Sequence, residues 1–244
     1  MRDFLRVKLP SLYNFLIFLN HSIFFWRFFR KSYSQFGEDL IVSHLFQGKG
    51  RGFYVDVGAH RPTQFSNTYF FYKRGWRGIN IDAMPGSMKL FRIVRHRDIN
   101  LEAAISGMKE TKLYYSFNRP LQNGIYDDET VLNTPGLVLI EKREIVTQTL
   151  SSILDSHLPK EVTIDILSID VEGLDLAVLK SNNWSKYKPR VILVEILNFN
   201  MEMLKDHEVS KFLSEAGYVF YSRTVHTIIF IENEMAAGLL QKET

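Results

Sequence analysis

The sequence of 244 residues contains no cysteine. Disulfide bonds, thiolate catalysis and cysteine-ligated zinc or iron–sulfur centres are therefore excluded for this chain. A chain without cysteine is compatible with a reducing compartment, so we expect a cytoplasmic location. The net charge is only +3, whereas nucleic-acid binding normally requires a clustered basic face. We therefore expect no nucleic-acid partner.

A repeat of fixed period is also absent, and no change in composition divides the main part of the chain. Hydrophobic residues make up 45% and charged residues 23% of the sequence, which is typical of a folded globular protein. We predict one α/β domain over residues 32–244. An aromatic-rich, helical N-terminal segment over residues 1–31 precedes it.

The N-terminal segment contains two apolar runs, Leu12–Leu19 and Ile23–Phe29, which are separated by Asn20–Ser22. A membrane-spanning helix needs about 20 mostly apolar residues, so this polar break argues against a span. One interpretation is a pair of hydrophobic helices that packs on the domain, or on a second copy of the chain in a homo-oligomer. The other is peripheral membrane contact through residues 9–31, where Arg and Lys flank the aromatic side chains.

The stretch Phe53–Val57 is apolar, β-branched and aromatic apart from Asp56, and it predicts a buried strand. Gly58 and then a segment with helix-capping residues follow it. A strand, a glycine turn and a helix form the usual binding site of a nucleotide-like cofactor, at the carboxyl end of the strands of an open sheet. The dinucleotide fingerprint G-x-G-x-x-G is absent, because only one glycine follows the strand. A pyrophosphate-containing cofactor is therefore disfavoured.

Three further apolar stretches predict strands that end in an acidic residue. They are Gly78–Asp82, Ile164–Asp170 and Pro189–Glu195. Because the carboxyl ends of parallel strands meet at one edge of a sheet, Asp56 and these terminal acids are expected to lie along that edge together. Carboxylates at partly buried strand ends cost free energy unless they are used or paired. The pattern therefore predicts a functional site at this edge.

Residues 107–136 form the least regular part of the sequence, in which only Lys112–Phe117 predicts a strand. Near the C-terminus, a helix is predicted over Glu208–Glu215, followed by strands over Tyr218–Ser222 and Val225–Ile231. The very short connection makes these two strands antiparallel. The predicted fold is therefore α/β, with a mostly parallel sheet that ends in an antiparallel C-terminal hairpin.

This architecture resembles the class I methyltransferase (Rossmann-like) fold, a seven-stranded sheet with helices on both faces. The chain is more specifically similar to the FkbM-type methyltransferase family. Four stretches carry the resemblance: Tyr33–Asp39 (YSQFGED), Phe53–His60 (FYVDVGAH), Gly78–Asp82 (GINID) and Leu167–Gly173 (LSIDVEG). The resemblance implies transfer of a methyl group from S-adenosylmethionine, usually to a hydroxyl oxygen on a sugar or polyketide.

The resemblance also implies roles in a cofactor pocket. The methionine part of the cofactor would be bordered by Asp56, Gly58, Ala59, Ser66 and Asn67. The remaining parts would be contacted by Asp82 at the ribose hydroxyls, Ala103 and Ala104 at the adenine, and Asp170 at the sulfonium. Gln35 is either a helix-capping residue or part of a loop that folds over the cofactor. His60 is either a polar wall of the pocket or a base.

Methylation of a sugar hydroxyl requires a base, or a metal ion that lowers the pKa of the hydroxyl. The candidate catalytic residues are Asp170, Glu172 and His60. Asp170, Glu195 and Asn198 are candidate ligands of a Mg²⁺ ion, because hard cations prefer oxygen ligands. The simpler interpretation of these acids is hydrogen bonding to backbone amides.

The sequence therefore predicts an S-adenosylmethionine-dependent methyltransferase that methylates an oxygen of a small-molecule or glycan acceptor, with residues 107–136 as the acceptor-binding lid. One alternative is a non-catalytic glycan-binding or scaffolding protein on the same fold, against which the retained acids argue. Another is a nicotinamide-dependent oxidoreductase, which the missing glycines disfavour.

Overall fold

The structure is a computed structural model that describes residues 6–24, 29–119, 122–126, 136–197 and 199–241. The chain divides into two compact units, Met1–Ser32 and Tyr33–Thr244. In the first unit, helix α2 (Pro10–Phe24) runs through residues 20–22 without interruption, because Asn, His and Ser each cost a helix less than about 1 kcal/mol. The break expected at Asn20–Ser22 is therefore wrong, and residues 25–28, which make up most of the second apolar run, lie outside the described residues. Among the described helices, none is long and apolar enough to cross a membrane.

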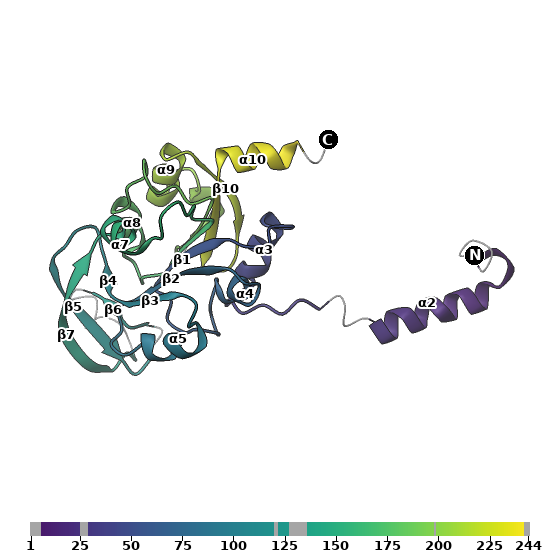
Figure 1. The fold of residues 1–244 in the computed structure, drawn as a ribbon, viewed down its shortest axis with the longest axis horizontal. Coiled ribbons are helices and arrows are strands. Elements are labelled where there is room, and N and C mark those ends of the chain that lie inside the picture. The colour runs from purple at the N-terminus through teal and green to yellow at the C-terminus, as the bar shows by residue number, and fades with distance from the viewer. Residues whose placement is uncertain (1–5, 25–28, 120–121, 127–135, 198, 242–244) are drawn as a thin grey trace. The chain divides into compact units, whose positions relative to one another are not determined.

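The second unit is built around a seven-stranded sheet with the order β10-β11-β9-β8-β1-β2-β3. The strands are β1 (Phe53–Val57), β2 (Arg77–Asp82), β3 (Ile99–Glu102), β8 (Ile166–Ile169), β9 (Val191–Glu195), β10 (Tyr218–Arg223) and β11 (Thr227–Glu232). β11 runs antiparallel to its neighbours, and the pairs from β3 to β9 are parallel. The predicted mostly parallel α/β sheet is confirmed (Figure 1). The hairpin differs in detail, with a register shift between Phe220 and Ser222.

Separate sets of helices cover the two faces of this sheet. Because side chains alternate along a strand, Val55 and Val57 join one hydrophobic core and Tyr54 joins the other. The first core includes α7 (Leu150–His157), α8 (Asp175–Lys180) and α9 (Glu208–Glu215). The second includes α3 (Glu38–Leu45), α4 (Tyr69–Lys73) and α10 (Asn233–Leu240). Each fully buried large apolar side chain stabilises the fold by about 1.5–3 kcal/mol.

A smaller sheet occupies much of the segment that is least regular in sequence. Its four strands, in the order β4-β7-β5-β6, are β4 (Ala104–Ile105), β5 (Thr111–Phe117), β6 (Gly124–Ile125) and β7 (Leu139–Gln148). The predicted strand over Lys112–Phe117 is confirmed as β5, whereas the pairing of β5 with β6 and β7 was not predicted. Residues 127–135 lie outside the described residues. Pairing between distant segments, which a local pattern does not reveal, makes this region regular.

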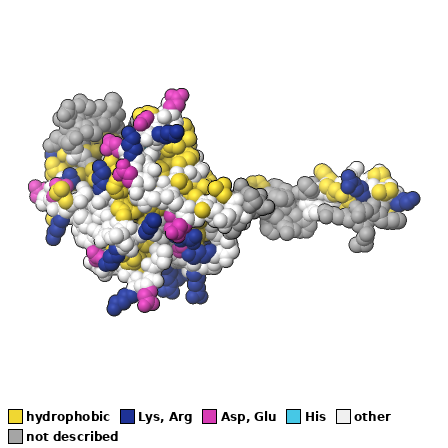
Figure 2. All heavy atoms as spheres, turned by 90° about the horizontal axis from the view of Figure 1, so that it is seen from above, with side chains coloured by type: hydrophobic (Ala, Val, Ile, Leu, Met, Phe, Trp, Pro, Cys, Tyr) yellow, Lys and Arg dark blue, Asp and Glu magenta, His cyan; other side chains and the backbone are white. Residues whose placement is uncertain are grey.

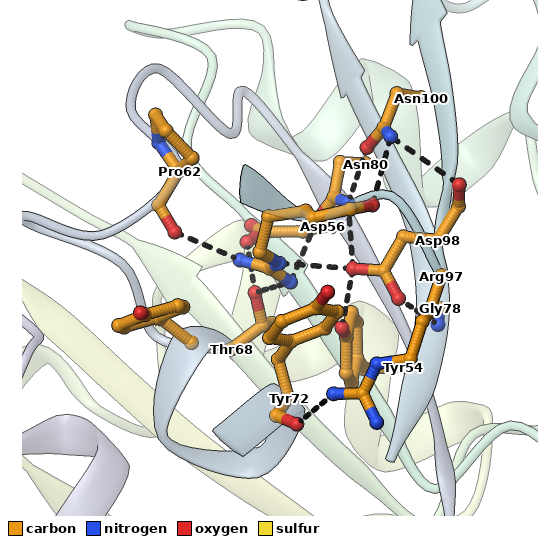
Figure 3. A network of polar contacts seen from close by, with 12 residues as sticks. Tyr54, Asp56, Pro62, Thr68, Tyr72, Gly78, Asn80, Arg97, Asp98 and Asn100 are labelled. Carbon is orange, nitrogen blue, oxygen red and sulfur yellow. Dashed lines mark hydrogen bonds and ion pairs between the residues drawn. The ribbon is translucent and has the colours of Figure 1, made fainter. Parts of the chain in front are cut away.

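Arg95 follows α5 (Met88–Val94) and is a fully buried charge. Its Nε donates a hydrogen bond to Asp98 Oδ2 at 2.9 Å, and neither side chain is exposed. Asp98 Oδ2 also accepts from Tyr54 Oη at 2.5 Å and from Asn80 Nδ2 at 3.0 Å (Figure 3). Asp98 Oδ1 accepts from the backbone N of Gly78 at 3.1 Å. The buried ion pair is thus surrounded by donors that satisfy the carboxylate, as a buried charge requires.

The other end of the Arg95 guanidinium holds the loop between β1 and α4. Its Nη1 donates to the carbonyl oxygen of Pro62 at 3.3 Å, and its Nη2 donates to Thr68 Oγ1 at 3.0 Å. Thr68 Oγ1 in turn donates to Asp56 Oδ2 at 2.6 Å (Figure 3). One buried charge therefore connects α5, β1, β2 and the loop that follows Gly58.

We predict that Arg95→Met lowers the free energy of unfolding by about 3–5 kcal/mol, because it leaves the Asp98 carboxylate buried without its cation. Denaturant unfolding measures this difference. Arg92→Met is the matched control, since Arg92 is exposed on the same helix and its replacement should change stability by less than about 0.5 kcal/mol. Equal unfolding midpoints for the two variants would contradict the structural role of Arg95.

Candidate functional site

A pocket lies at the carboxyl ends of the central parallel strands. Its lining comes from the ends of β1, β2, β3 and β8 and from the small sheet: Val57, Gly58, His60, Asp82, Ala83, Met84, Ala103, Ala104, Ile105, Tyr114, Asn123, Gly124, Ile125, Asp170, Val171 and Glu172. The pocket is therefore at the edge where an open α/β sheet binds its ligands. The small sheet supplies one wall, which places part of the irregular segment beside the predicted site.

Gly58 makes the turn at the end of β1 possible. Its φ is +83°, in the left-handed region that favours glycine, and a Cβ there would lie 1.7 Å from the carbonyl oxygen of Asp170. The backbone N atoms of Gly58 and Ala59 both donate to the carbonyl oxygen of Ile81, at 2.9 and 3.0 Å. The turn is thus held tightly between the ends of β2 and β8.

Asp82, at the end of β2, is a buried carboxylate that orders two loops. Its Oδ2 accepts from the backbone N of His60 and its Oδ1 from the backbone N of Met84, both at 2.8 Å. Burial raises the pKa of Asp82, and these two N–H donors oppose the rise. Each carboxylate oxygen has a further lone pair, so the group can still accept hydrogen bonds from ligand hydroxyls.

His60 lines the same pocket with a neutral ring. Burial lowers its pKa below the ordinary value, and the nearby Asp82 carboxylate opposes that effect. Its Nε2 is buried and has no hydrogen-bond partner among the described residues. A buried, unpaired ring nitrogen costs free energy, so it is suited to a hydrogen bond with a ligand.

Three acids form a cluster at the pocket, and we call Asp170, Glu172 and Glu195 the acid cluster. A carboxylate oxygen from each lies within 4.8 Å of the other two. Glu172 has a φ of +53° and Gly173 a φ of +97°, so the chain turns sharply after β8. Asp175 holds this turn, since its Oδ1 and Oδ2 accept from the backbone N atoms of Val171 and Gly173 at 3.3 and 3.2 Å.

Like charges and burial perturb the acid cluster strongly. Desolvation raises the pKa of both Glu172 and Glu195 to about 7, and the charges of Asp170 and Glu172, respectively, add to this rise. The pKa of Asp170 is raised well above its usual value, first by desolvation and then by the charge of Glu195 and a hydrogen bond with the Glu195 carboxyl. Part of the Asp170 side chain is nevertheless exposed, where it opens on the pocket. A hydrogen bond between two carboxyls requires a shared proton. Near neutral pH, the cluster therefore holds protons that it can exchange.

The structure adds residues that the sequence did not identify. Tyr126, after β6, has its pKa raised by burial and then by the charges of Glu172 and Glu195, so its hydroxyl lies near the acid cluster. Asn123 donates to Met84 Sδ at 3.5 Å and so fixes the small sheet against the end of β2. Both belong to residues 107–136, the least regular part of the sequence. The length of this segment was the only sign in the sequence that it contributes to a functional site.

The predicted site residues fall into two groups. The pocket is lined by Gly58, His60, Asp82, Ala103, Ala104, Asp170 and Glu172. The pocket lining does not include Gln35, Asp56, Ala59, Ser66 and Asn67. The predicted metal ligands Asp170 and Glu195 meet in the acid cluster, whereas Asn198 lies outside the described residues.

The five predicted residues outside the pocket lining mostly make contacts that hold the fold together. Asp56 is buried and accepts from Thr68 Oγ1, which itself accepts from Arg95 Nη2 and makes no cap hydrogen bond to α4. Ser66 Oγ instead accepts from the backbone N of Tyr69 at 3.2 Å, and α4 has only five residues. The helix begins at Tyr69 with Thr68 as its N-cap residue, so the segment with helix-capping residues lies where the sequence predicted it.

The remaining members of the second group lie nearby. Asn67 Nδ2 donates to Ser168 Oγ on β8 at 3.1 Å. Ala59 packs in a buried cluster with Met88 and Phe91, and Gln35 is exposed. The N-cap residue of α3 is Gly37 and not Gln35, and Asp39 and Glu38 in the first turn accept hydrogen bonds from the backbone N atoms of Tyr33 and Phe36.

The pocket suits an adenosine-type ligand. The Asp82 carboxylate can accept hydrogen bonds from ribose hydroxyls. The small side chains of Ala103 and Ala104 leave room for a flat base. His60 Nε2, which has no partner among the described residues, can form a hydrogen bond with the ligand. Fold and pocket together therefore define an α/β protein of the methyltransferase type.

The comparison with known families agrees with this class. The family model described as Methyltransferase FkbM domain matches residues 56–220. Because this match covers more than half of the sequence, the chain belongs to the FkbM methyltransferase family, as the sequence motifs predicted. Membership in this family implies the use of S-adenosylmethionine. A search of curated proteins found no match.

We predict that Glu172→Gln stabilises the protein at about pH 8 and not at about pH 4. The pKa of Glu172 rises from 4.5 to about 7 on folding, so the folded state binds more protons and loses stability as the pH rises between these values. Removing the charge should raise the free energy of unfolding by about 1–2 kcal/mol above neutral pH.

Denaturant unfolding at the two pH values measures this effect. The control is Glu215→Gln, since Glu215 is exposed on α9 and its replacement should change stability by less than about 0.5 kcal/mol at either pH. A Glu172→Gln variant that is less stable than the parent protein at the higher pH would contradict the account.

Proposed function

We propose that the protein transfers a methyl group from S-adenosylmethionine to a hydroxyl oxygen of a sugar or glycan. The observation that carries the proposal is the acid cluster beside a pocket suited to an adenosine-type cofactor. Within this cluster, the pKa of Glu172 and that of Glu195 are each raised to about 7. A proton acceptor with a pKa near the working pH is the most effective catalyst for deprotonating a hydroxyl.

The residues of the pocket divide between cofactor and acceptor. Asp82 is proposed to hold the ribose hydroxyls, and Ala103 and Ala104 to flank the adenine. Gly58 keeps the end of β1 close to the backbone of Asp170, which is the first residue of the acid cluster. When bound, S-adenosylmethionine supplies an activated methyl group on a sulfonium. The protein then has to align the acceptor hydroxyl and remove its proton.

The acid cluster is proposed to perform that proton transfer. A sugar hydroxyl is a weak nucleophile, so it gains from a base within hydrogen-bond reach. Glu172 and Glu195 are partly deprotonated near pH 7, and Asp170 shares a proton with Glu195. The cluster can therefore accept the proton of the hydroxyl as its methylation proceeds. His60, a neutral base on the same pocket, is the second candidate.

The same cluster is also a candidate site for a divalent cation, the role expected for Asp170 and Glu195 from the sequence. Octahedral Mg²⁺ with bonds near 2 Å keeps its ligand oxygens about 3–4 Å apart. The carboxylate oxygens of the cluster lie within 4.8 Å of one another, which small side-chain movements would bring into this range. A cation there would lower the pKa of a bound hydroxyl.

A chelator distinguishes these two uses of the cluster. If the acids act directly as the base, activity should be unchanged in EDTA. Loss of activity in EDTA and its recovery with Mg²⁺ or Mn²⁺, but not with Na⁺, would instead assign the cluster to a cation. Circular dichroism in EDTA controls for loss of the fold.

We predict that the full chain labels a sugar hydroxyl when it is incubated with methyl-labelled S-adenosylmethionine and an extract of glycans and lipid-linked sugars. The rate should rise with pH through about 7, as Glu172 and Glu195 lose their protons. Glu172→Gln should lower kcat by roughly 10²–10⁴-fold, whereas Glu215→Gln should leave it unchanged. Labelling of a nitrogen, or a rate independent of pH, would contradict the proposed reaction.

A further inference from the structure

A second pocket lies at the amino ends of the strands that form the cofactor pocket. Four cationic side chains line it, Lys49, Arg51, Arg77 and Arg97, and Asp165 is the only acid among its lining residues. We call it the basic pocket. Its volume of about 570 Å³ is within the range typical of small-ligand sites.

The basic pocket is separate from the cofactor pocket. Phe53 and Arg77 begin β1 and β2, and Asp165 comes just before β8. The carboxyl ends of the same strands border the cofactor pocket. Strands of four to six residues separate their ends by roughly 13–20 Å, so one small ligand does not fill both pockets.

Two of the four cations already have protein partners. Lys49 forms an ion pair with Asp165, which is buried and also accepts from the backbone N of Phe53 at 3.0 Å. Arg97 Nη2 donates to the carbonyl oxygen of Tyr72 at 2.6 Å, and its guanidinium lies 4.1 Å from the centroid of the Tyr72 ring. The Arg97 side chain is therefore held in place, and among the described residues no carboxylate forms an ion pair with it.

The other two cations are uncompensated. Arg51 and Arg77 are exposed, and their guanidinium groups have no hydrogen-bond or ion-pair partner in the part of the chain that the structure describes. On the face seen in Figure 2, basic and acidic side chains are interspersed, which is the usual arrangement on a protein surface. The basic pocket departs from this arrangement, because Arg51, Arg77 and Arg97 converge on one cavity without a matching carboxylate.

The floor of the basic pocket is fixed. At Gly52, a Cβ would lie 2.5 Å from the Trp76 ring and 2.6 Å from Asp165 Oδ2, so the chain passes here too closely for any larger residue. Arg77 N donates to the carbonyl oxygen of Gly52 at 3.2 Å. Arg51 and Arg77 are thereby anchored on neighbouring backbones, which reduces the entropy lost when both bind one ligand.

We propose that the basic pocket binds a phosphate-bearing anion with more than one negative charge, such as a pyrophosphate group. Guanidinium groups match phosphate oxygens in geometry and charge, and charge-assisted hydrogen bonds of this kind are stronger than neutral ones. A doubly or triply charged group would neutralise Arg51, Arg77 and Arg97 together. Free nucleotides and sugar diphosphates carry such a group, and phosphorylated inositol lipids carry phosphate monoesters with two negative charges.

Calorimetric titration of the full chain with inorganic pyrophosphate tests the proposal. We expect binding that weakens with added salt and whose affinity falls at least about tenfold in the double variant Arg51→Gln/Arg77→Gln. The matched control is Arg92→Gln/Lys180→Gln, which removes the same charge from exposed positions outside the pocket and should bind as the parent protein does. No heat with pyrophosphate, or equal losses in both double variants, would overturn the proposal.

Vesicle sedimentation distinguishes the two sources of phosphate. Vesicles of phosphatidylcholine with and without phosphatidylinositol phosphate are mixed with the parent chain and with both double variants. Binding that depends on Arg51 and Arg77 and on the phosphorylated lipid assigns the pocket to a lipid headgroup. Binding of pyrophosphate without this lipid dependence assigns it to a soluble phosphate compound. Binding of S-adenosylmethionine, measured in parallel, should be unchanged in all variants, so a failure here is distinct from a failure of the proposed methyl transfer.

Discussion

The burial of one guanidinium group organises the region around the pocket at the carboxyl ends of the parallel strands. Arg95 has no exposed surface, and a charge in that position is tolerated only with partners on all sides. Its hydrogen-bond partners come from the turn between α5 and β3, from β2 and from the loop after β1, and they include Asp98, Asn80 and Thr68. Through Thr68, the network reaches Asp56 at the centre of the sheet. The path of the loop beside the pocket is therefore set by the requirement to satisfy this charge.

The acid cluster has the opposite electrostatic character. Arg95 is stabilised by its surroundings, whereas Asp170, Glu172 and Glu195 repel one another in a partly desolvated site. Groups held in this way reduce the stability of the fold above neutral pH, and such strain is typical of functional sites. This combination supports the proposal that the pocket holds a cofactor in a fixed position and that the acid cluster exchanges protons with an acceptor.

The sequence predicted the features that depend on local pattern. Apolar stretches that end in an acid placed Asp82, Asp170 and Glu195 at the edge of the sheet, and the motifs identified the family. It did not predict the role of Arg95, because this residue stands in a basic run typical of a solvated helix end. Tyr126 reaches the acid cluster through the pairing of β5 with β6, a long-range contact without a local signal.

We propose that the pocket at the carboxyl ends of β1, β2 and β8 binds S-adenosylmethionine. Calorimetric titration of the full chain with S-adenosylmethionine, S-adenosylhomocysteine and NAD tests it most directly, together with the variant Asp82→Asn. The account predicts binding of the first two ligands and not of NAD, with affinity about 10–100-fold lower in the variant, because the ribose hydroxyls lose a charged acceptor. The absence of binding by both adenosyl compounds, or binding of NAD in their place, would contradict it.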